Sequence, residues 1–206
     1  MLDKRSTHHI EGPVGNLETV LNPPSGTVRG LALIAHPHPL YGGTLDNKVA
    51  QTLATTFAQL GHMAVRMNFR GVGASAGQFD EGRGETDDWL AVHAQMRQRY
   101  PQGPLFLAGF SFGAYVMSAL AQRLQCQQLV LVGPAVRAFP MPTVAASTLI
   151  IHGELDTTIP LKDVLEWATP QDLSLVVVPG ADHFFHRRLH HIKTWVSRVC
   201  HVPARS

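Results

Sequence analysis

The fold of this chain is decided by one stretch, Leu105-Phe106-Leu107-Ala108-Gly109-Phe110-Ser111-Phe112-Gly113. Its first half is an apolar run typical of a buried strand, and a helical pattern of apolar residues begins at Ala114. Gly-x-Ser-x-Gly between a strand and a helix is typical of a nucleophile elbow, a sharp turn that exposes the serine hydroxyl. The stretch therefore predicts a strand–turn–helix unit in which Ser111 is a nucleophile that carries a covalent acyl intermediate.

On both sides of this stretch, short apolar runs alternate with helical patterns. We expect strands over residues 28–35, 63–69, 105–108, 129–132, 148–151 and 173–178, and helices over 46–60, 85–100, 114–124, 161–168 and 187–199. Strands that are apolar throughout are buried on both faces, which favours a mostly parallel central sheet with helices on both faces. Roughly the first 25 residues are less regular and are expected to add one or two antiparallel edge strands. The prediction is an α/β fold, formed by a single domain over residues 1–206.

The composition indicates an ordinary globular protein. The chain has 206 residues, of which 45% are hydrophobic and 16% charged, and its formal net charge is +2. Its basic residues are scattered, so neither nucleic acid nor a membrane surface is expected as a partner. The N-terminus, Met1-Leu2-Asp3-Lys4-Arg5, continues into polar residues and lacks the apolar core of a signal peptide. No apolar stretch approaches the length of a transmembrane helix, and Cys126 and Cys200 show no motif spacing. We therefore expect a cytoplasmic protein with reduced thiols, present as a monomer or a small homo-oligomer.

The Gly-x-Ser-x-Gly pattern occurs a second time, at Gly73-Ala74-Ser75-Ala76-Gly77. Ser75 lies well beyond the end of its expected strand, in a polar, glycine-rich loop with no helix directly after it. That context is typical of a turn. Ser111, in contrast, directly opens a helix, and a helix N-terminus favours a developing negative charge. Ser111 is therefore the predicted nucleophile, and Ser75 is interpreted as a loop residue.

A serine hydroxyl needs a general base, and the base needs a carboxylate that orients it. In this architecture the chain order is serine, acid, histidine, and each of these residues follows a strand. Asp156 lies in the loop after the next-to-last expected strand, whereas Glu154, the competing carboxylate, lies nearer the strand end. His183 lies in the loop after the last expected strand, and a helix follows it. The predicted catalytic residues are Ser111, Asp156 and His183.

The negative charge of a tetrahedral intermediate requires backbone N–H donors, which form an oxyanion hole. One donor is expected from Phe112, the residue after the nucleophile, and the other from the loop after the first strand of the parallel sheet. That loop reads His36-Pro37-His38-Pro39-Leu40-Tyr41-Gly42-Gly43. Proline has no N–H, which leaves His38, Leu40 and Tyr41 as candidates, with Leu40 preferred.

Two histidine-rich segments raise the alternative of a metal site. His36 and His38 are two positions apart, and His186 and His190 are four positions apart, with His191 beside them. No acidic residue or thiol is spaced to complete either set. Loop architecture with hydrogen bonds to the backbone is therefore the expected role of His36 and His38. No metal and no cofactor are expected.

With its serine, acid and histidine in this order, the chain resembles the α/β-hydrolase superfamily over nearly its whole length. Residues 68–75 are similar to the superfamily's turn after strand 4, and residues 149–156 are similar to its acid-bearing segment. The loop over residues 36–43 resembles that of small, lidless bacterial serine hydrolases with a His-Pro-His-Pro loop. Many relatives have His-Gly-x where this chain has His38-Pro39-Leu40, and this alignment supports Leu40 as the oxyanion donor.

The resemblance also implies a reaction. A haloalkane dehalogenase would have Asp at position 111 and a dienelactone hydrolase would have Cys, whereas this chain has Ser. The implied activity is hydrolysis of carboxylic esters by a carboxylesterase-like serine hydrolase. Thioester or peptide-bond hydrolysis by the same residues is the alternative, and a non-catalytic binding protein on this fold is a further one.

Larger relatives insert a lid between the two strands that precede the acid, and this chain has little room for one. Only residues 133–147 separate these strands, and three of them are prolines. So short a segment leaves no space for a helical cap. We expect an open, shallow site with Tyr41, Phe110, Phe112 and Phe139 as apolar walls, and a small-molecule ester or other acyl compound as the substrate.

Overall fold

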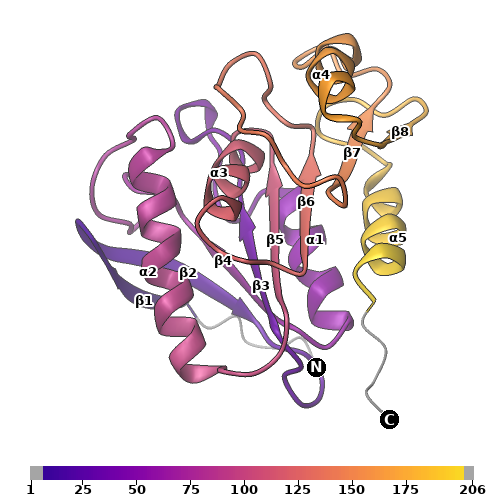
Figure 1. Cartoon of the computed structure of the whole chain (residues 1–206). Helices are drawn as coiled ribbons and strands as arrows, with labels where there is room; N and C mark the ends of the chain where they lie inside the picture. Colours follow the sequence, from indigo (N-terminus) through magenta and orange to yellow (C-terminus); the bar gives the residue numbers. More distant parts are fainter. Residues whose placement is uncertain (1–6, 202–206) are drawn as a thin grey trace.

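The structure, a computed structural model, describes residues 7–201, and its centre is an eight-stranded sheet (Figure 1). The strands are β1 (Thr7–Gly12), β2 (Gly15–Asn22), β3 (Leu31–Ala35), β4 (Met63–Met67), β5 (Leu105–Phe110), β6 (Gln128–Val132), β7 (Leu149–Gly153) and β8 (Leu175–Val178). They are arranged across the sheet in the order β1-β2-β4-β3-β5-β6-β7-β8. β3 to β8 pair in parallel, whereas β1 and β2 are antiparallel. The expected mostly parallel sheet with antiparallel N-terminal strands is confirmed.

Helices cover both faces of this sheet, as expected. The α-helices of the described residues are α1 (Lys48–Gln59), α2 (Arg83–Arg99), α3 (Phe112–Ala121), α4 (Leu161–Ala168) and α5 (Leu189–Val199). Apolar side chains of α1 and α5 form the core on one face, and those of α2, α3 and α4 form the core on the other. In Figure 1, α2 and α3 lie in front of the sheet and α1 lies behind it. The sheet strands between these two layers are therefore apolar on both sides.

Two elements begin later than expected, and local hydrogen bonds lie at both starts. Helix α1 begins at Lys48 because the side chain of Asn47 accepts the N–H of Val49 at 2.9 Å, which makes Asn47 the N-cap. Strand β3 begins at Leu31, three residues later than expected, and the N–H of Arg29 before it donates to the carbonyl of Gly61 at 2.8 Å.

The segment between β6 and β7 contains no helix. Residues 133–148 form bends, turns and irregular loop. Ala135 and Val144 belong to the core on the α2–α3 face, and Val136, Phe139 and Met141 pack against it. The loop is therefore attached to the body of the molecule. The prediction that no helical cap interrupts this position is confirmed.

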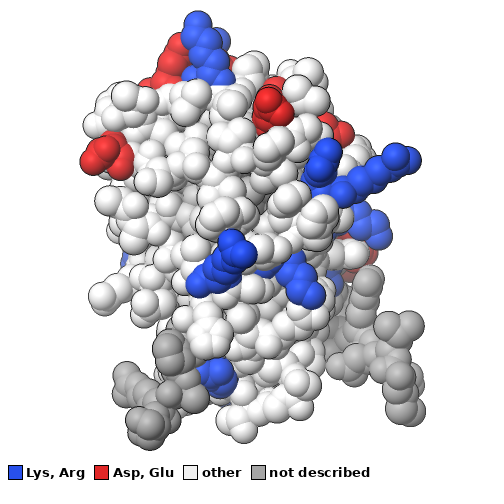
Figure 2. Space-filling model, turned by 90° about the vertical axis from the view of Figure 1, so that its right-hand side faces the viewer, with Lys and Arg blue, Asp and Glu red and all other residues white. Residues whose placement is uncertain are grey.

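Because β3, β5, β7 and β8 run parallel, the loops that follow them lie at the same edge of the sheet, where ligands bind in open α/β sheets. Away from that edge, the face that carries α5 shows Lys and Arg side chains separated by uncharged surface (Figure 2). Within residues 7–201, no helix is both long and apolar enough to cross a bilayer.

Candidate active site

Ser111 lies in a strained turn between β5 and α3. Its φ is 57° and its ψ is −116°, a backbone conformation that residues other than glycine rarely adopt. Gly109 and Gly113 permit the turn, because a Cβ at Gly109 would lie 2.1 Å from the carbonyl oxygen of Gly113. A Cβ at Gly113 would lie 2.5 Å from the carbonyl oxygen of Ala35, at the end of β3. The two glycines thus bring the strand, the helix and the neighbouring strand end together around the serine.

Three side chains meet beside this turn. His183 Nε2 lies 3.2 Å from Ser111 Oγ, and His183 Nδ1 lies 2.6 Å from Asp156 Oδ2. The serine comes from the end of β5, the aspartate from the loop after β7 and the histidine from the loop after β8. Ser111 is 9% exposed, and the other two residues are each 5% exposed. The structure therefore brings the three predicted catalytic residues into one chain of hydrogen bonds.

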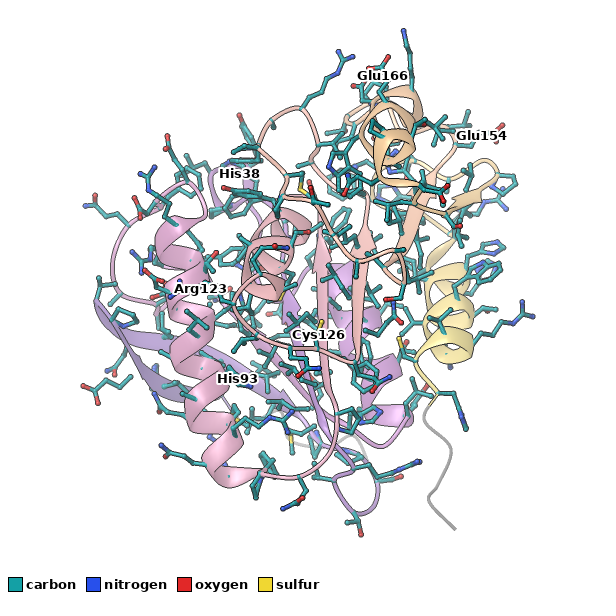
Figure 3. All side chains as sticks on the ribbon, in the orientation of Figure 1. His38, His93, Arg123, Cys126, Glu154 and Glu166 are labelled. Carbon is teal, nitrogen blue, oxygen red and sulfur yellow. The ribbon has the colours of Figure 1, made fainter. Side chains whose placement is uncertain are left out.

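Asp156 is held in place by its own loop. Its Oδ1 accepts the N–H of Thr158 at 2.9 Å and that of Ile159 at 2.7 Å, which leaves Oδ2 for the imidazole. The competing carboxylate, Glu154, is exposed and projects outward in Figure 3. Its Oε2 accepts the N–H of Gly180 at 2.9 Å. The aspartate, and not the glutamate, therefore orients the histidine.

The second serine has a structural role. Ser75 is 7% exposed, and its hydroxyl donates to the carbonyl of Asn68 at 2.7 Å. The same oxygen accepts the N–H of Glu18, on β2, at 2.9 Å. Ser75 therefore ties the loop after β4 to β2, and its interpretation as a loop residue is confirmed.

The loop after β3 lies against the nucleophile turn, and its N–H groups differ in their partners. The N–H of Leu40 donates to His38 Nδ1 at 3.2 Å, and that of Tyr41 donates to the carbonyl of His38 at 3.2 Å. The N–H of His38 has no acceptor among residues 7–201. The His38 ring lies 5.0 Å from the ring of Phe112, the residue after the nucleophile. Figure 3 shows His38 at the end of the molecule where these loops meet.

His36 joins this loop to the loop after β4. It is fully buried, its Nδ1–H donates to the carbonyl of Pro37 at 2.7 Å, and its Nε2 accepts the N–H of Phe69 at 3.0 Å. Burial lowers the pKa of His36 to about 3, although the bond to Pro37 opposes that change. Burial also lowers the pKa of His38. The expected role of these two imidazoles in bonding the loop backbone is confirmed.

Two of the four expected apolar walls require correction. The side chains of Phe110 and Phe112 are 0% exposed, so neither ring can line an open site. Phe110 is the last residue of β5 and its ring packs 4.9 Å from that of His183, which it supports. Phe112 belongs to the core on the α2–α3 face. The pattern of strand and helix in the sequence does not reveal which side chains next to the nucleophile point into the core.

The other two expected walls are accessible, and a third accessible aromatic residue was missed. Tyr41 is 87% exposed, and Phe139 is partly buried, stacked on Tyr115 at 5.0 Å. Phe184 is 46% exposed, and its ring lies 5.2 Å from that of His183. Its position directly after His183 in the sequence is the signal that could have indicated a residue of the site.

The histidine-rich segments do not converge on a metal site in the part of the chain that the structure describes. No group of three or more His, Cys, Asp or Glu side chains there is arranged to hold an ion. On the loop before α5, His186 Nδ1 instead lies 2.6 Å from Asp182 Oδ2. The rings of His190 and His191 lie 4.2 Å apart on α5.

A parallel sheet between two helical layers, a strained serine after β5 and a loop without a helix after β6 together define the lidless α/β serine hydrolases. Comparison with known proteins agrees with this class. The chain belongs to the family described as serine aminopeptidase, S33, whose profile matches residues 42–146.

Several relatives match the chain over most of its length. A lidless α/β serine hydrolase from Xanthomonas campestris has 34% sequence identity and a TM-score of 0.91, and the match covers 100% of this chain and 99% of that one. An α/β serine hydrolase homologue from Coxiella burnetii has 38% identity and a TM-score of 0.89, over 96% and 98% of the two chains. An uncharacterized protein from Rickettsia prowazekii (strain Madrid E) is 32% identical over 196 residues, which cover 86% of this chain and 81% of that one.

Proposed function

We propose that this protein hydrolyses carboxylic esters through a covalent acyl intermediate on Ser111. The observation that carries this proposal is the continuous hydrogen-bonded arrangement of Ser111 Oγ, His183 Nε2 and His183 Nδ1 with Asp156 Oδ2, at 3.2 Å and 2.6 Å. A general base within hydrogen-bond reach of a serine, itself oriented by a buried carboxylate, is what nucleophilic catalysis by serine needs.

Acylation begins when Ser111 Oγ attacks the ester carbonyl carbon and His183 Nε2 takes the hydroxyl proton. The imidazolium that forms is stabilised by the ionised carboxylate of Asp156. The tetrahedral intermediate then loses its alcohol as the bond between the acyl carbon and the alcohol oxygen breaks. The same proton passes from His183 Nε2 to that oxygen.

Deacylation repeats these steps with water. His183 Nε2 removes a proton from a water molecule that attacks the acyl carbon, and it gives this proton to Ser111 Oγ as the bond between that oxygen and the acyl carbon breaks. The carboxylic acid product then departs. The alcohol has already left at this stage, so the rate of deacylation depends only on the acyl group.

The oxyanion of both intermediates requires two donors, and we assign them to the loop after β3 and the start of α3. Phe112, the first residue of α3, supplies one N–H at a helix N-terminus. For the second donor we now favour His38 over Leu40. The N–H of Leu40 already donates to His38 Nδ1, whereas that of His38 is without an acceptor in the described residues and its ring contacts Phe112.

The test of the nucleophile is intact-mass detection of a fluorophosphonate adduct. We expect one adduct on the wild type, none on Ser111→Ala, and one on Ser75→Ala, which serves as the control for the second Gly-x-Ser-x-Gly pattern. Ester turnover by Ser111→Ala should fall by roughly three to six orders of magnitude with the fold intact. Absence of an adduct on folded wild type would overturn the proposal in favour of a binding protein.

The family's description as serine aminopeptidase favours amide hydrolysis as a second candidate. An ester, a thioester and an anilide that share one acyl group separate these candidates, because the same serine must attack each carbonyl. We expect the highest kcat/KM for the ester or thioester. A higher value for the anilide would establish a peptidase instead.

A further inference from the structure

Phe184 is the exposed aromatic residue nearest the proposed general base. It is 46% exposed, and its ring meets that of His183 edge to face, with centroids 5.2 Å apart and planes at 79°. The buried ring of Phe110 packs against the same imidazole at 4.9 Å and 36°. His183 therefore has one buried aromatic neighbour, which supports it, and one neighbour whose ring remains accessible to a ligand.

The mechanism fixes which part of the substrate comes close to His183. During acylation, the alcohol oxygen must lie within hydrogen-bond distance of His183 Nε2 to receive its proton. The carbonyl oxygen must instead face the N–H donors of Phe112 and the loop after β3. The group attached to the alcohol oxygen is therefore next to the histidine, and the accessible aromatic ring beside that histidine is Phe184.

The rest of the site does not offer the same contact. The rings of Tyr41 and Phe139 lie with that of His38, at 4.7 Å and 5.6 Å, on the side of the proposed oxyanion hole. The segment after β6 places no helix over the site. An alcohol group that leaves past His183 therefore has Phe184 as its aromatic neighbour.

From this arrangement we propose that Phe184 determines specificity for the alcohol part of the substrate, and that the preferred esters carry an apolar, above all an aromatic, alcohol group. The proposal rests on the ester hydrolysis proposed above. Aromatic rings of this kind prefer edge-to-face or offset contacts, which an exposed ring on the solvent side of the histidine can make with a benzyl group. An aliphatic methyl group is too small to gain from that contact.

The experiment compares benzyl acetate with methyl acetate, two esters with the same acyl group and leaving alcohols of similar acidity. In Phe184→Ala, the ratio of kcat/KM for benzyl acetate to that for methyl acetate should fall about threefold to tenfold relative to the wild type. Phe184→Tyr should restore the ratio. Val14→Ala, at an exposed residue of the β1–β2 turn, is the matched control and should not change it.

A second pair of esters, methyl butyrate and methyl acetate, differs in the acyl group instead. Phe184→Ala should leave the ratio for this pair unchanged, and acetyl-enzyme formed from either acetate should deacylate at the wild-type rate. An equal loss in kcat/KM for all three esters, together with slower deacylation, would show that Phe184 only positions His183, and would overturn the proposal. An unchanged benzyl-to-methyl ratio would overturn it as well.

Failure of this inference is distinguishable from failure of the proposed function. Wild type that forms the fluorophosphonate adduct and hydrolyses methyl acetate, but shows no effect of Phe184→Ala on the ratio, contradicts the specificity proposal alone. Wild type that forms no adduct and hydrolyses none of the three esters contradicts both.

Discussion

His152 lies directly behind the proposed catalytic carboxylate. It is fully buried on β7, its Nε2 lies 2.9 Å from the carbonyl oxygen of Ile159, and the same nitrogen lies 3.6 Å from Asp156 Oδ2. Burial lowers the pKa of His152, against the attraction of Asp156. Because a carbonyl oxygen can only accept, Nε2–H donates to Ile159. His152 Nδ1 has no hydrogen-bond partner in the described residues. Within the described residues, the hydrogen bond of this side chain is made by Nε2. It holds Ile159, and with it the loop that carries Asp156, against β7.

This geometry predicts different results for two amide substitutions. The amide nitrogen of Gln reaches the place of His Nε2, whereas that of Asn reaches only the place of Nδ1. His152→Gln should keep most of the wild-type kcat for ester hydrolysis. His152→Asn should lower kcat about tenfold to a hundredfold with little change in KM, because displacement of the carboxylate misaligns His183.

Thermal unfolding of both variants supplies the control, since kcat is compared only well below the lower Tm. If His152→Asn matched the wild type in kcat, the position of Asp156 would not depend on the bond between His152 and Ile159. The positioning role of His152 would then be wrong.

Single residues show how far a sequence can be interpreted. Ser111, Asp156 and His183 could be selected because each follows a strand and their chain order is fixed by the architecture. The structure places them in contact, and their catalytic role stays a prediction. The preference for Leu40 could not foresee that its N–H bonds the side chain of His38, because a turn two residues long is decided by local side-chain geometry.

At the scale of elements, His36 holds the ends of β3 and β4 together. Its Nε2 accepts the N–H of Phe69, so protonation of that nitrogen would break the bond and place a charge in the core. Burial lowers the pKa of His36 to about 3 in the folded protein, against 6.5 as the ordinary value. The unfolded chain therefore binds a proton more readily between pH 6.5 and pH 3.

The free energy of unfolding should consequently fall as the pH falls through this window. The contribution of neutral His36 to stability is fully present above pH 6.5. Between pH 7 and pH 5 the loss from His36 alone is about 2 kcal/mol in the free energy of unfolding. His36→Gln, which can still accept the N–H of Phe69 but does not titrate, should show a smaller decrease between these two pH values. Urea unfolding at pH 7 and pH 5 measures both decreases. Equal decreases in the two proteins would show that His36 does not contribute to the pH dependence.

For the molecule as a whole, the layer arrangement followed from the sequence because strands such as β3 and β5 are apolar at every position. Such strands are stable only between two helical layers, which leaves few architectures. The sequence does not predict in the same way which side chains are exposed around the site. Phe110 is buried and Phe184 is exposed although both flank predicted catalytic residues in the sequence, because their directions depend on contacts between β5 and the loop after β8.

The lidless architecture predicts how the enzyme responds to aggregated substrate. A mobile lid over a site makes the rate depend on the conditions that open the lid. Here the segment over residues 133–148 has no helix, and Val136, Phe139 and Met141 attach it to the core. Hydrolysis of a short-chain ester should therefore follow a simple saturation curve through the concentration at which the ester forms aggregates. A steep rise in rate at that concentration would mean that this segment opens, and the prediction would be wrong.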